Sequence, residues 1–180
     1  DISADGTVMT GQLQFQNILA APEGLFDAPL PIDGAAVDLR LSLGEVVSVE
    51  IGQAMSFHDA LRVALSGRLD AGPDGLTTAL DVHVQEVALP TVLTYWPEQA
   101  IPNTRWWVAE HLTRASAQGV DFALRSGPEQ APLYELSFDF DGADIRALPA
   151  APPILDASGF LRLANQQLVV GVDGGDVRAV

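Results

Sequence analysis

The stretch LRVALSGRLDAGPDGLTTALDVHV (Leu61–Val84) indicates the fold of this chain most directly. Apolar and polar residues alternate on either side of AGPDG (Ala71–Gly75), whose proline and glycines are typical of a turn. Successive side chains of a β-strand point to opposite faces, so this alternation predicts strands with one apolar and one polar face. The stretch therefore predicts a β-hairpin. Its alternating apolar residues are Leu61, Val63, Leu65 and Leu69 before the turn, and Leu76, Leu80, Val82 and Val84 after it.

The same alternation recurs along the chain and predicts more strands. We expect a mainly β protein: a curved antiparallel meander sheet, that is, a β-groove or half-barrel, with one short α-helix. A closed β-sandwich is the alternative, because the apolar face of a sheet must be covered and a second sheet would cover it. The further strands are predicted at Val37–Leu43, Val47–Ile51, Val120–Leu124, Tyr134–Phe140, Gly159–Leu163 and Gln167–Val172.

One segment has the spacing of a helix instead of a strand. The apolar residues between Trp107 and Ala115 fall on one helical face. Asn103 is suited to cap the N-terminus, and Gly119 is suited to end the helix. The pattern predicts a helix over Thr104–Ala117.

The chain contains a possible internal repeat. The segments PIDGAAVDLRL (Pro31–Leu41) and PILDASGFLRL (Pro153–Leu163) align without a gap, and six of their eleven positions are identical. An alternating strand follows each segment. With the residues that precede the segments, the two copies cover about 12–52 and 134–174. Similar stacked units are typical of proteins built by repetition. We therefore interpret residues 1–180 as a single β-rich segment of a larger, repeat-built protein.

The composition excludes several classes of function. The net charge is −15, which argues against nucleic acid as a partner because phosphates would be repelled. All nine basic residues are arginine and cysteine is absent, so neither Schiff-base lysines nor thiolate sites are available. No run of about 18 apolar residues is present that would span a bilayer. The chain begins at Asp1 without an initiator methionine or a signal peptide, and we expect it to be a fragment.

The three histidines do not form a catalytic pattern. His58 lies between Ser56 and Asp59, which superficially resembles a hydrolase triad. Adjacent residues of a strand point to opposite faces, however, so this spacing does not build a proton relay. His83 falls on the polar face of its strand, and His111 falls on the predicted helix. We interpret all three as surface residues.

The carboxylates near Phe138 resemble a calcium loop only at first sight. Asp139, Asp141 and Asp144 lack the loop length and the terminal glutamate of an EF-hand. An Asp-Gly pair after alternating apolar residues is typical of a turn. We therefore expect no catalytic residue, no metal site and no cofactor, and we predict that the chain is not an enzyme.

Every tryptophan lies within YWPEQAIPNTRWW (Tyr95–Trp107). These aromatic side chains have three interpretations. They can plug the core, with their N–H groups bonded. They can form a surface at a lipid–water boundary, where indoles are favoured. They can also make a platform on which sugars stack.

The order of features around this stretch resembles the AsmA-like superfamily, and especially its YhdP and TamB type. The resemblance covers about residues 76–175. It rests on Trp96–Pro97, then Arg105, Trp106 and Trp107 at the start of a helix, then Gly119 at the start of a strand. Phe138 and the turn at Pro152–Pro153, before the strand Gly159–Leu163, complete the pattern.

The resemblance implies a function in lipid transfer. Proteins of this type resemble bridge-like lipid transporters, in which a curved sheet forms a groove with an apolar inner face. They are held in the inner membrane of a Gram-negative cell by a helix that this chain lacks, and they cross the periplasm. The chain would then be one periplasmic segment of a conduit for phospholipid between the two membranes.

The partners expected for such a segment are phospholipid acyl chains and the rest of the parent chain. Burial of an acyl chain yields about 0.8 kcal/mol per CH₂, so no specific residue is needed to hold it. A structural or protein-interaction module of the cell envelope is the alternative function, and a carbohydrate-binding module is a third. The residues predicted to line the groove are Leu76, Leu80, Val82, Val84, Leu136, Phe138 and Phe140.

Overall fold

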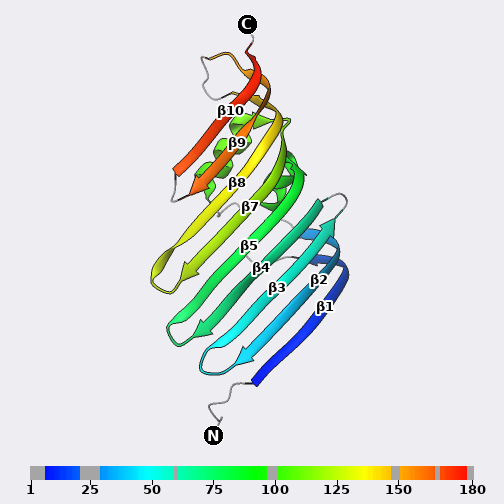
Figure 1. The fold of residues 1–180 in the computed structure, drawn as a ribbon, viewed down its shortest axis with the longest axis vertical. Helices are drawn as coiled ribbons and strands as arrows, with labels where there is room; N and C mark the ends of the chain where they lie inside the picture. Colours follow the sequence, from blue (N-terminus) through cyan, green and yellow to red (C-terminus); the bar gives the residue numbers. More distant parts are fainter. Residues whose placement is uncertain are drawn as a thin grey trace.

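The computed structural model shows one long antiparallel sheet with two short helices on one of its faces (Figure 1). It describes residues 7–20, 29–58, 61–96, 101–146, 151–164 and 167–177. The sheet has ten strands, which follow one another as a meander in the order β1-β2-β3-β4-β5-β7-β8-β9-β10, while the short β6 pairs with β8. It is not closed into a barrel.

The strands are long, mostly 11 to 16 residues. Their bounds are β1 Thr7–Ala20, β2 Leu30–Leu43, β3 Val47–His58, β4 Leu61–Gly72, β5 Gly75–Ala88, β6 Leu112–Thr113, β7 Ser116–Gly127, β8 Gln130–Ile145, β9 Ile154–Ala164 and β10 Gln167–Val177. The helices are α1 Leu89–Tyr95 and α2 Pro102–His111.

The expected architecture is confirmed. Each predicted strand exists and is longer than its alternating core, and the sheet is a mainly β antiparallel meander. The described residues form one sheet, so the closed sandwich is not the fold. Strand β1 was not predicted. Its run Gln12–Gln16 alternates between glutamine and apolar residues, a pattern typical of a strand that the prediction did not include.

The prediction of a single helix over Thr104–Ala117 is wrong in number and in extent. The connection between β5 and β7 contains two helices, and α2 begins at Pro102 and ends at His111. Proline at the first turn is favourable there, since its missing N–H has no intrahelical partner. Asn103 therefore lies inside the first turn, and Ile101 holds the cap position.

Pairing between strands explains why the helix ends early. Leu112 pairs with Ile145 of β8, and Ala117 pairs with Val87 of β5. The apolar spacing up to Ala115 fits a helix, but hydrogen bonds to β8 and β5 hold Leu112 and Ala117 in strands. Such pairing with distant strands is not visible in the local sequence pattern.

The sequence predicted that Gly119 ends a helix and starts a strand. Both predictions are wrong. Gly119 lies inside β7 with a φ of 57°, where the register with β8 shifts between Gln118 and Asp121. A left-handed residue at such an irregularity is typical of a β-bulge, and glycine adopts it without a Cβ penalty.

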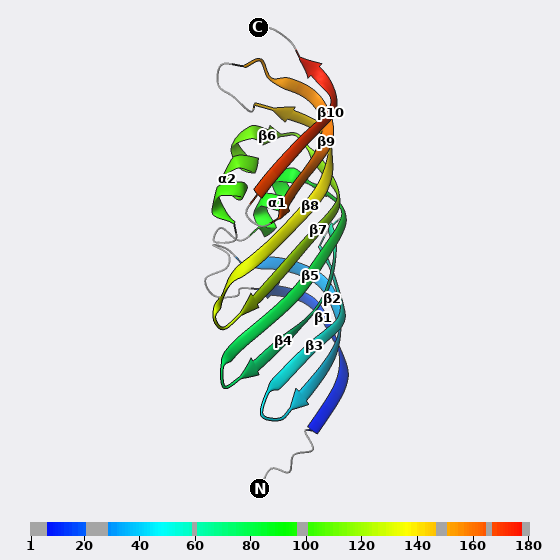
Figure 2. The same cartoon turned by 60° about the vertical axis from the view of Figure 1, so that its left-hand side comes forward.

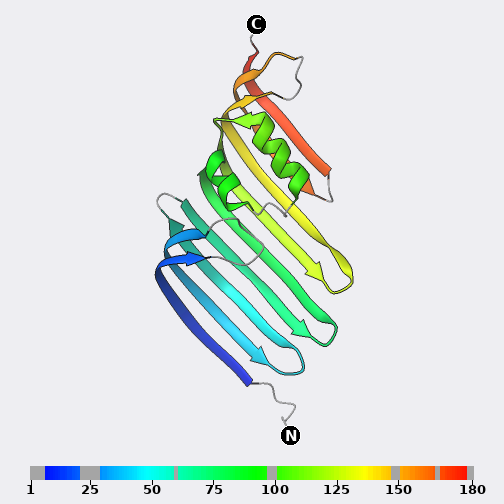
Figure 3. The same cartoon turned by 180° about the vertical axis from the view of Figure 1, so that it is seen from behind.

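The two helices cover only one end of the sheet (Figure 2, Figure 3). Seen from behind, α1 and α2 lie over the C-terminal strands, and neither of these two described helices lies over β3 or β4. The buried core lies between these helices and the sheet. It includes Val108 of α2 and Leu161 of β9, both 0% exposed, and Trp96 at the end of α1.

Candidate functional site

The face of the sheet that carries the helices presents apolar residues on every long strand. Directly opposed residues of neighbouring strands lie on the same face, so the register identifies which side chains form it. One row of opposed residues crosses the whole sheet without a polar member, and we call it the apolar row. It consists of Leu13, Val37, Ala54, Leu65, Val82, Phe122, Leu136, Leu163 and Leu168.

The apolar row runs along the long direction of the sheet. With neighbouring strands about 4.8 Å apart, its eight steps span roughly 38 Å. A bilayer core of about 30 Å holds the acyl chains of two leaflets, so one chain needs only about 15 Å. The row is therefore long enough to accommodate a complete acyl chain.

The helices cover the row at one end and leave it open toward the other. Leu136 is 5% exposed and Leu163 is 3% exposed, whereas Leu13 at the β1 edge is 46% exposed. Between them lies a group of half-buried aliphatic side chains that belong neither to the buried core nor to the residues packed against it. We call this group the open strip: Leu39, Leu41, Val49, Ile51, Leu65, Leu69, Leu80 and Val82.

The open strip is an apolar patch that extends over neighbouring strands. Single exposed leucines are common, but soluble proteins rarely leave large contiguous apolar patches open to water. The open strip extends over four neighbouring strands, β2 to β5. Such a patch marks a surface that binds a lipid, a membrane or another protein.

The opposite face of the sheet is polar. Its cross-strand contacts include Gln12 Nε2 to Asp38 Oδ1 at 2.8 Å and Arg125 to Asp81 Oδ1 at 2.6 Å. Arg68 Nε donates to both carboxylate oxygens of Asp70 at 2.8 Å. This hydrogen bond lowers the pKa of Asp70, so its carboxylate stays ionised and hydrated. One face thus favours water and the other favours hydrocarbon.

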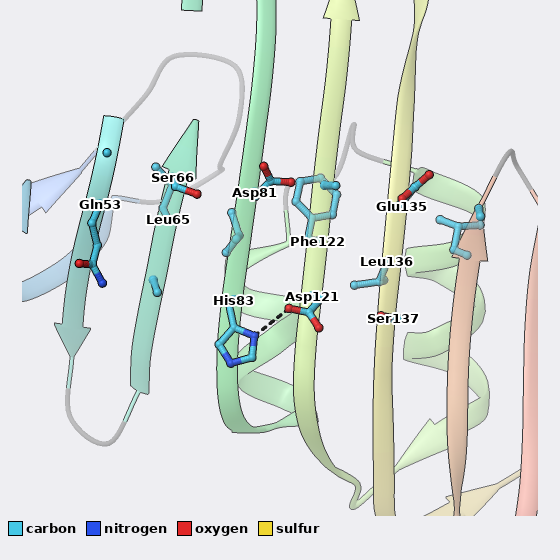
Figure 4. Close-up of a pocket in the computed structure, with 16 residues that line it drawn as sticks. Gln53, Leu65, Ser66, Asp81, His83, Asp121, Phe122, Glu135, Leu136 and Ser137 are labelled. Atoms are coloured by element: carbon cyan, nitrogen blue, oxygen red, sulfur yellow. Dashed lines mark hydrogen bonds and ion pairs between the residues drawn. The ribbon is translucent and has the colours of Figure 1, made fainter. Parts of the chain in front are cut away.

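A hollow of about 490 Å³ is lined by residues of both faces. They include Leu65, Val82, Phe122, Leu136 and Leu163 of the apolar row and Asp81, His83, Asp121 and Glu135 of the polar face. Figure 4 shows His83 of β5 and Asp121 of β7 in it, with Nδ1 and Oδ1 2.7 Å apart, and Glu135 and Ser137 on the next strand. Both partners of the His83–Asp121 pair are more than half exposed. In the described part of the chain, histidines and carboxylates do not gather into a group that could hold a metal ion.

The histidines predicted to be surface residues each have a partner from elsewhere in the fold. His58 contacts Asp33 Oδ1 at 3.0 Å. His83 of β5 contacts Asp121 of the neighbouring strand β7. The ring of His111 stacks on that of Trp107, with centroids 5.1 Å apart and planes 7° apart.

The seven residues predicted to line a groove all lie on the apolar face, but in two different environments. Leu80 and Val82 are half-buried in the open strip, and Leu76 near the β4–β5 turn is 52% exposed. The other four are packed into the core beneath or beside the helices, where protein already covers them: Val84, Leu136, Phe138 and Phe140.

Residues that the prediction did not include complete the surface. Leu39, Ile51 and Leu65 continue the open strip on β2 to β4, and Phe122 continues the apolar row on β7. Their alternation was visible in the sequence. What was missing was the register that places them beside Leu80 and Val82.

Among the residues on which the resemblance rests, Trp96, Arg105, Trp106 and Trp107 lie in or next to the two helices. Trp96 is buried, Trp107 is half-buried and Trp106 is 62% exposed. Trp96 belongs to the core and Trp107 packs against it, which matches the core-plug interpretation for these two, whereas Trp106 does not. Pro152 and Pro153 precede β9 directly, while Pro97 lies outside the described residues.

Arg105 of α2 forms hydrogen bonds with the C-terminal end of α1. Its Nε donates to the carbonyl oxygen of Trp96 at 3.1 Å, and its Nη2 donates to that of Leu93 at 3.2 Å. These carbonyls belong to the C-terminal end of α1, where backbone acceptors lack intrahelical partners. The guanidinium therefore satisfies two acceptors at once.

Replacement of Arg105 by methionine is expected to destabilise the helical cover. Loss of two charge-assisted hydrogen bonds should lower the free energy of unfolding by about 1–3 kcal/mol. Urea denaturation followed by tryptophan fluorescence measures this change. Arg40→Met, on the exposed polar face of β2, is the control and should shift stability by less than about 0.5 kcal/mol. Equal effects of the two substitutions would contradict the role of Arg105.

A second arginine, Arg114, joins the turn between β6 and β7 to β8. Arg114 donates to both oxygens of Asp144 on β8, at 2.7 and 2.8 Å. The hydrogen bond from Arg114 lowers the pKa of this carboxyl. The contact holds the turn between β6 and β7 against β8, which keeps the helical cover in place.

Neither described helix has the length and apolar composition needed to cross a membrane. No known protein family, curated protein or solved structure matches this chain.

Proposed function

We propose that this chain is a periplasmic segment of an AsmA-like envelope protein, and that its apolar face guides phospholipid between the inner and outer membranes of a Gram-negative bacterium. The segment acts without catalysis. Acyl chains lie on the open strip, and the polar face stays in water. The observation that carries the proposal is the apolar row, which crosses the whole sheet and emerges from beneath the helices into the open strip.

The energetics of such guidance follow from the chemistry of the surface. Burial of an acyl chain contributes about 0.8 kcal/mol per CH₂, without any directional contact. The open strip offers aliphatic side chains on neighbouring strands and therefore no single deep binding point. A chain can consequently move along it in small steps, which suits passage better than storage.

The headgroup has a separate environment in this proposal. The sheet is open at both edges, so a lipid whose tails lie on the apolar face can keep its headgroup in water. No described side chain on the open strip carries a charge. The proposal therefore predicts weak discrimination between phospholipid headgroups.

Native mass spectrometry of the purified chain tests the proposal. The chain is expressed in a Gram-negative host, purified without detergent, and co-purifying lipid is extracted and identified. We expect phospholipid adducts of more than one headgroup class. A mass without adducts, combined with no uptake of a fluorescent phospholipid from vesicles, would sink the proposal.

The second candidate is a protein-interaction module of the cell envelope. It is favoured by the same open strip, because another protein can cover an apolar sheet face as well as lipid can. The same mass measurement separates the two, since a protein partner leaves the purified chain free of lipid.

A further inference from the structure

The two edge strands of the sheet differ in how well they are protected. Among the described residues, β1 pairs only with β2, and β10 pairs only with β9. An edge strand presents a row of unpaired N–H and C=O groups to any strand that approaches. Natural proteins block such edges with charges, prolines or bulges.

Strand β10 has these protections. Its register with β9 shifts twice, between Val172 and Gly174 and between Gly174 and Asp176. Asp173 and Asp176 add negative charge along the same half of the strand. A further strand cannot pair regularly with this edge.

Strand β1 has neither charges nor prolines, and its irregular residue, Asn17 with a φ of 52°, lies near its C-terminal end. Its sequence TVMTGQLQFQNILA contains no charged residue and no proline, in a chain in which 18% of residues are charged. Its pairing with β2 is regular from Thr7 to Gln16. Met9 and Leu13 remain 48% and 46% exposed. The edge is therefore long, regular and open.

We propose that β1 is a homodimerisation edge, which pairs antiparallel with β1 of a second copy of this chain. Pairing about Gln12 places Met9 opposite Phe15 of the second copy on the apolar face, where sulfur–aromatic contact is favourable. On the polar face, Thr10 lies opposite Gln14. A two-fold axis perpendicular to the sheet keeps both apolar faces on the same side.

Charge explains why a second copy fits this edge and no other. Two copies that each carry a net charge of −15 repel one another over most of their surfaces. On β2, Asp38 and Arg40 have opposite charges and lie directly opposite Gln12 and Thr10 of β1, and the Asp38 carboxylate accepts a hydrogen bond from Gln12. Pairing of β1 with β1 brings no charged side chain opposite another, and both strands have the same alternation of faces.

The test is the oligomeric state of the purified chain at about 100 μM, measured by light scattering after size exclusion. We expect a dimer. The double variant Thr10→Lys/Gln14→Lys changes only the polar side of β1, and we expect it to be a monomer. The matched control Gln167→Lys/Val169→Lys adds the same charge to the polar side of β10, and we expect it to remain a dimer.

The control excludes an effect of net charge, because both variants become less negative by two. Far-UV circular dichroism confirms that the variants fold. A monomeric wild-type chain would overturn the proposal, and so would a dimer that survives the β1 variant. None of the four substitutions touches the open strip, so this test succeeds or fails independently of lipid binding.

Discussion

Replacement of Val82 by aspartate is expected to weaken phospholipid binding at least about tenfold, which corresponds to 1.4 kcal/mol or more. Val82 is a central member of the apolar row, between Leu65 of β4 and Phe122 of β7. A carboxylate at this position would have to lose its water wherever an acyl chain covers it, and that desolvation is costly.

Fold stability should change much less, because Val82 is only half-buried and water reaches its side chain. Uptake of a fluorescent phospholipid by the purified variant measures the loss of binding. Leu65→Asp, on the neighbouring strand, should have the same effect.

The matched control is Ala79→Asp on the same strand. Ala79 lies on the polar face opposite Arg68 and Arg125, so an aspartate there adds the same charge in a favourable setting. We expect lipid uptake equal to that of the wild-type chain. If Val82→Asp and Ala79→Asp bind lipid equally well, the open strip is not the binding surface.

Replacement of Phe140 by alanine is expected to lower the free energy of unfolding by about 3–5 kcal/mol. Phe140 is 2% exposed and lies on β8 between Ala117 of β7 and Gly159 of β9. Its small neighbours cannot fill the space that the ring leaves, so a cavity remains. Because whole domains have only about 5–15 kcal/mol of stability, this loss is a large part of it.

Urea denaturation followed by circular dichroism measures this change. Leu133→Ala, at a 53% exposed position of the same strand, is the control and should cost less than about 1 kcal/mol. The pair of variants also tests the role first predicted for Phe140. A core residue loses stability on truncation, whereas a lipid-lining residue would lose lipid uptake and keep most of its stability.

The faces of the strands could be predicted from the sequence because side-chain direction alternates with a period of two. The alternation in Leu61–Val84 placed the leucines and valines of that hairpin on one face, and it led to an open meander sheet. The lining candidates were all placed on the apolar face for the same reason. Strand β1 was missed although Gln12–Gln16 alternates in the same way, so its signal was present in the sequence.

The tertiary structure decided which strands are neighbours and what covers them. Leu80 and Phe138 occupy equivalent apolar positions in strands with the same alternation. Leu80 is nevertheless half-buried and Phe138 is 3% exposed, because helices lie over only one end of the sheet. The end of α2 at His111 depended in the same way on the pairing of Leu112 with Ile145. Alternation is a local property of the backbone, whereas register and cover depend on residues distant in sequence. The sequence by itself therefore determined an apolar and a polar face, and only the tertiary structure decided that part of the apolar face stays open.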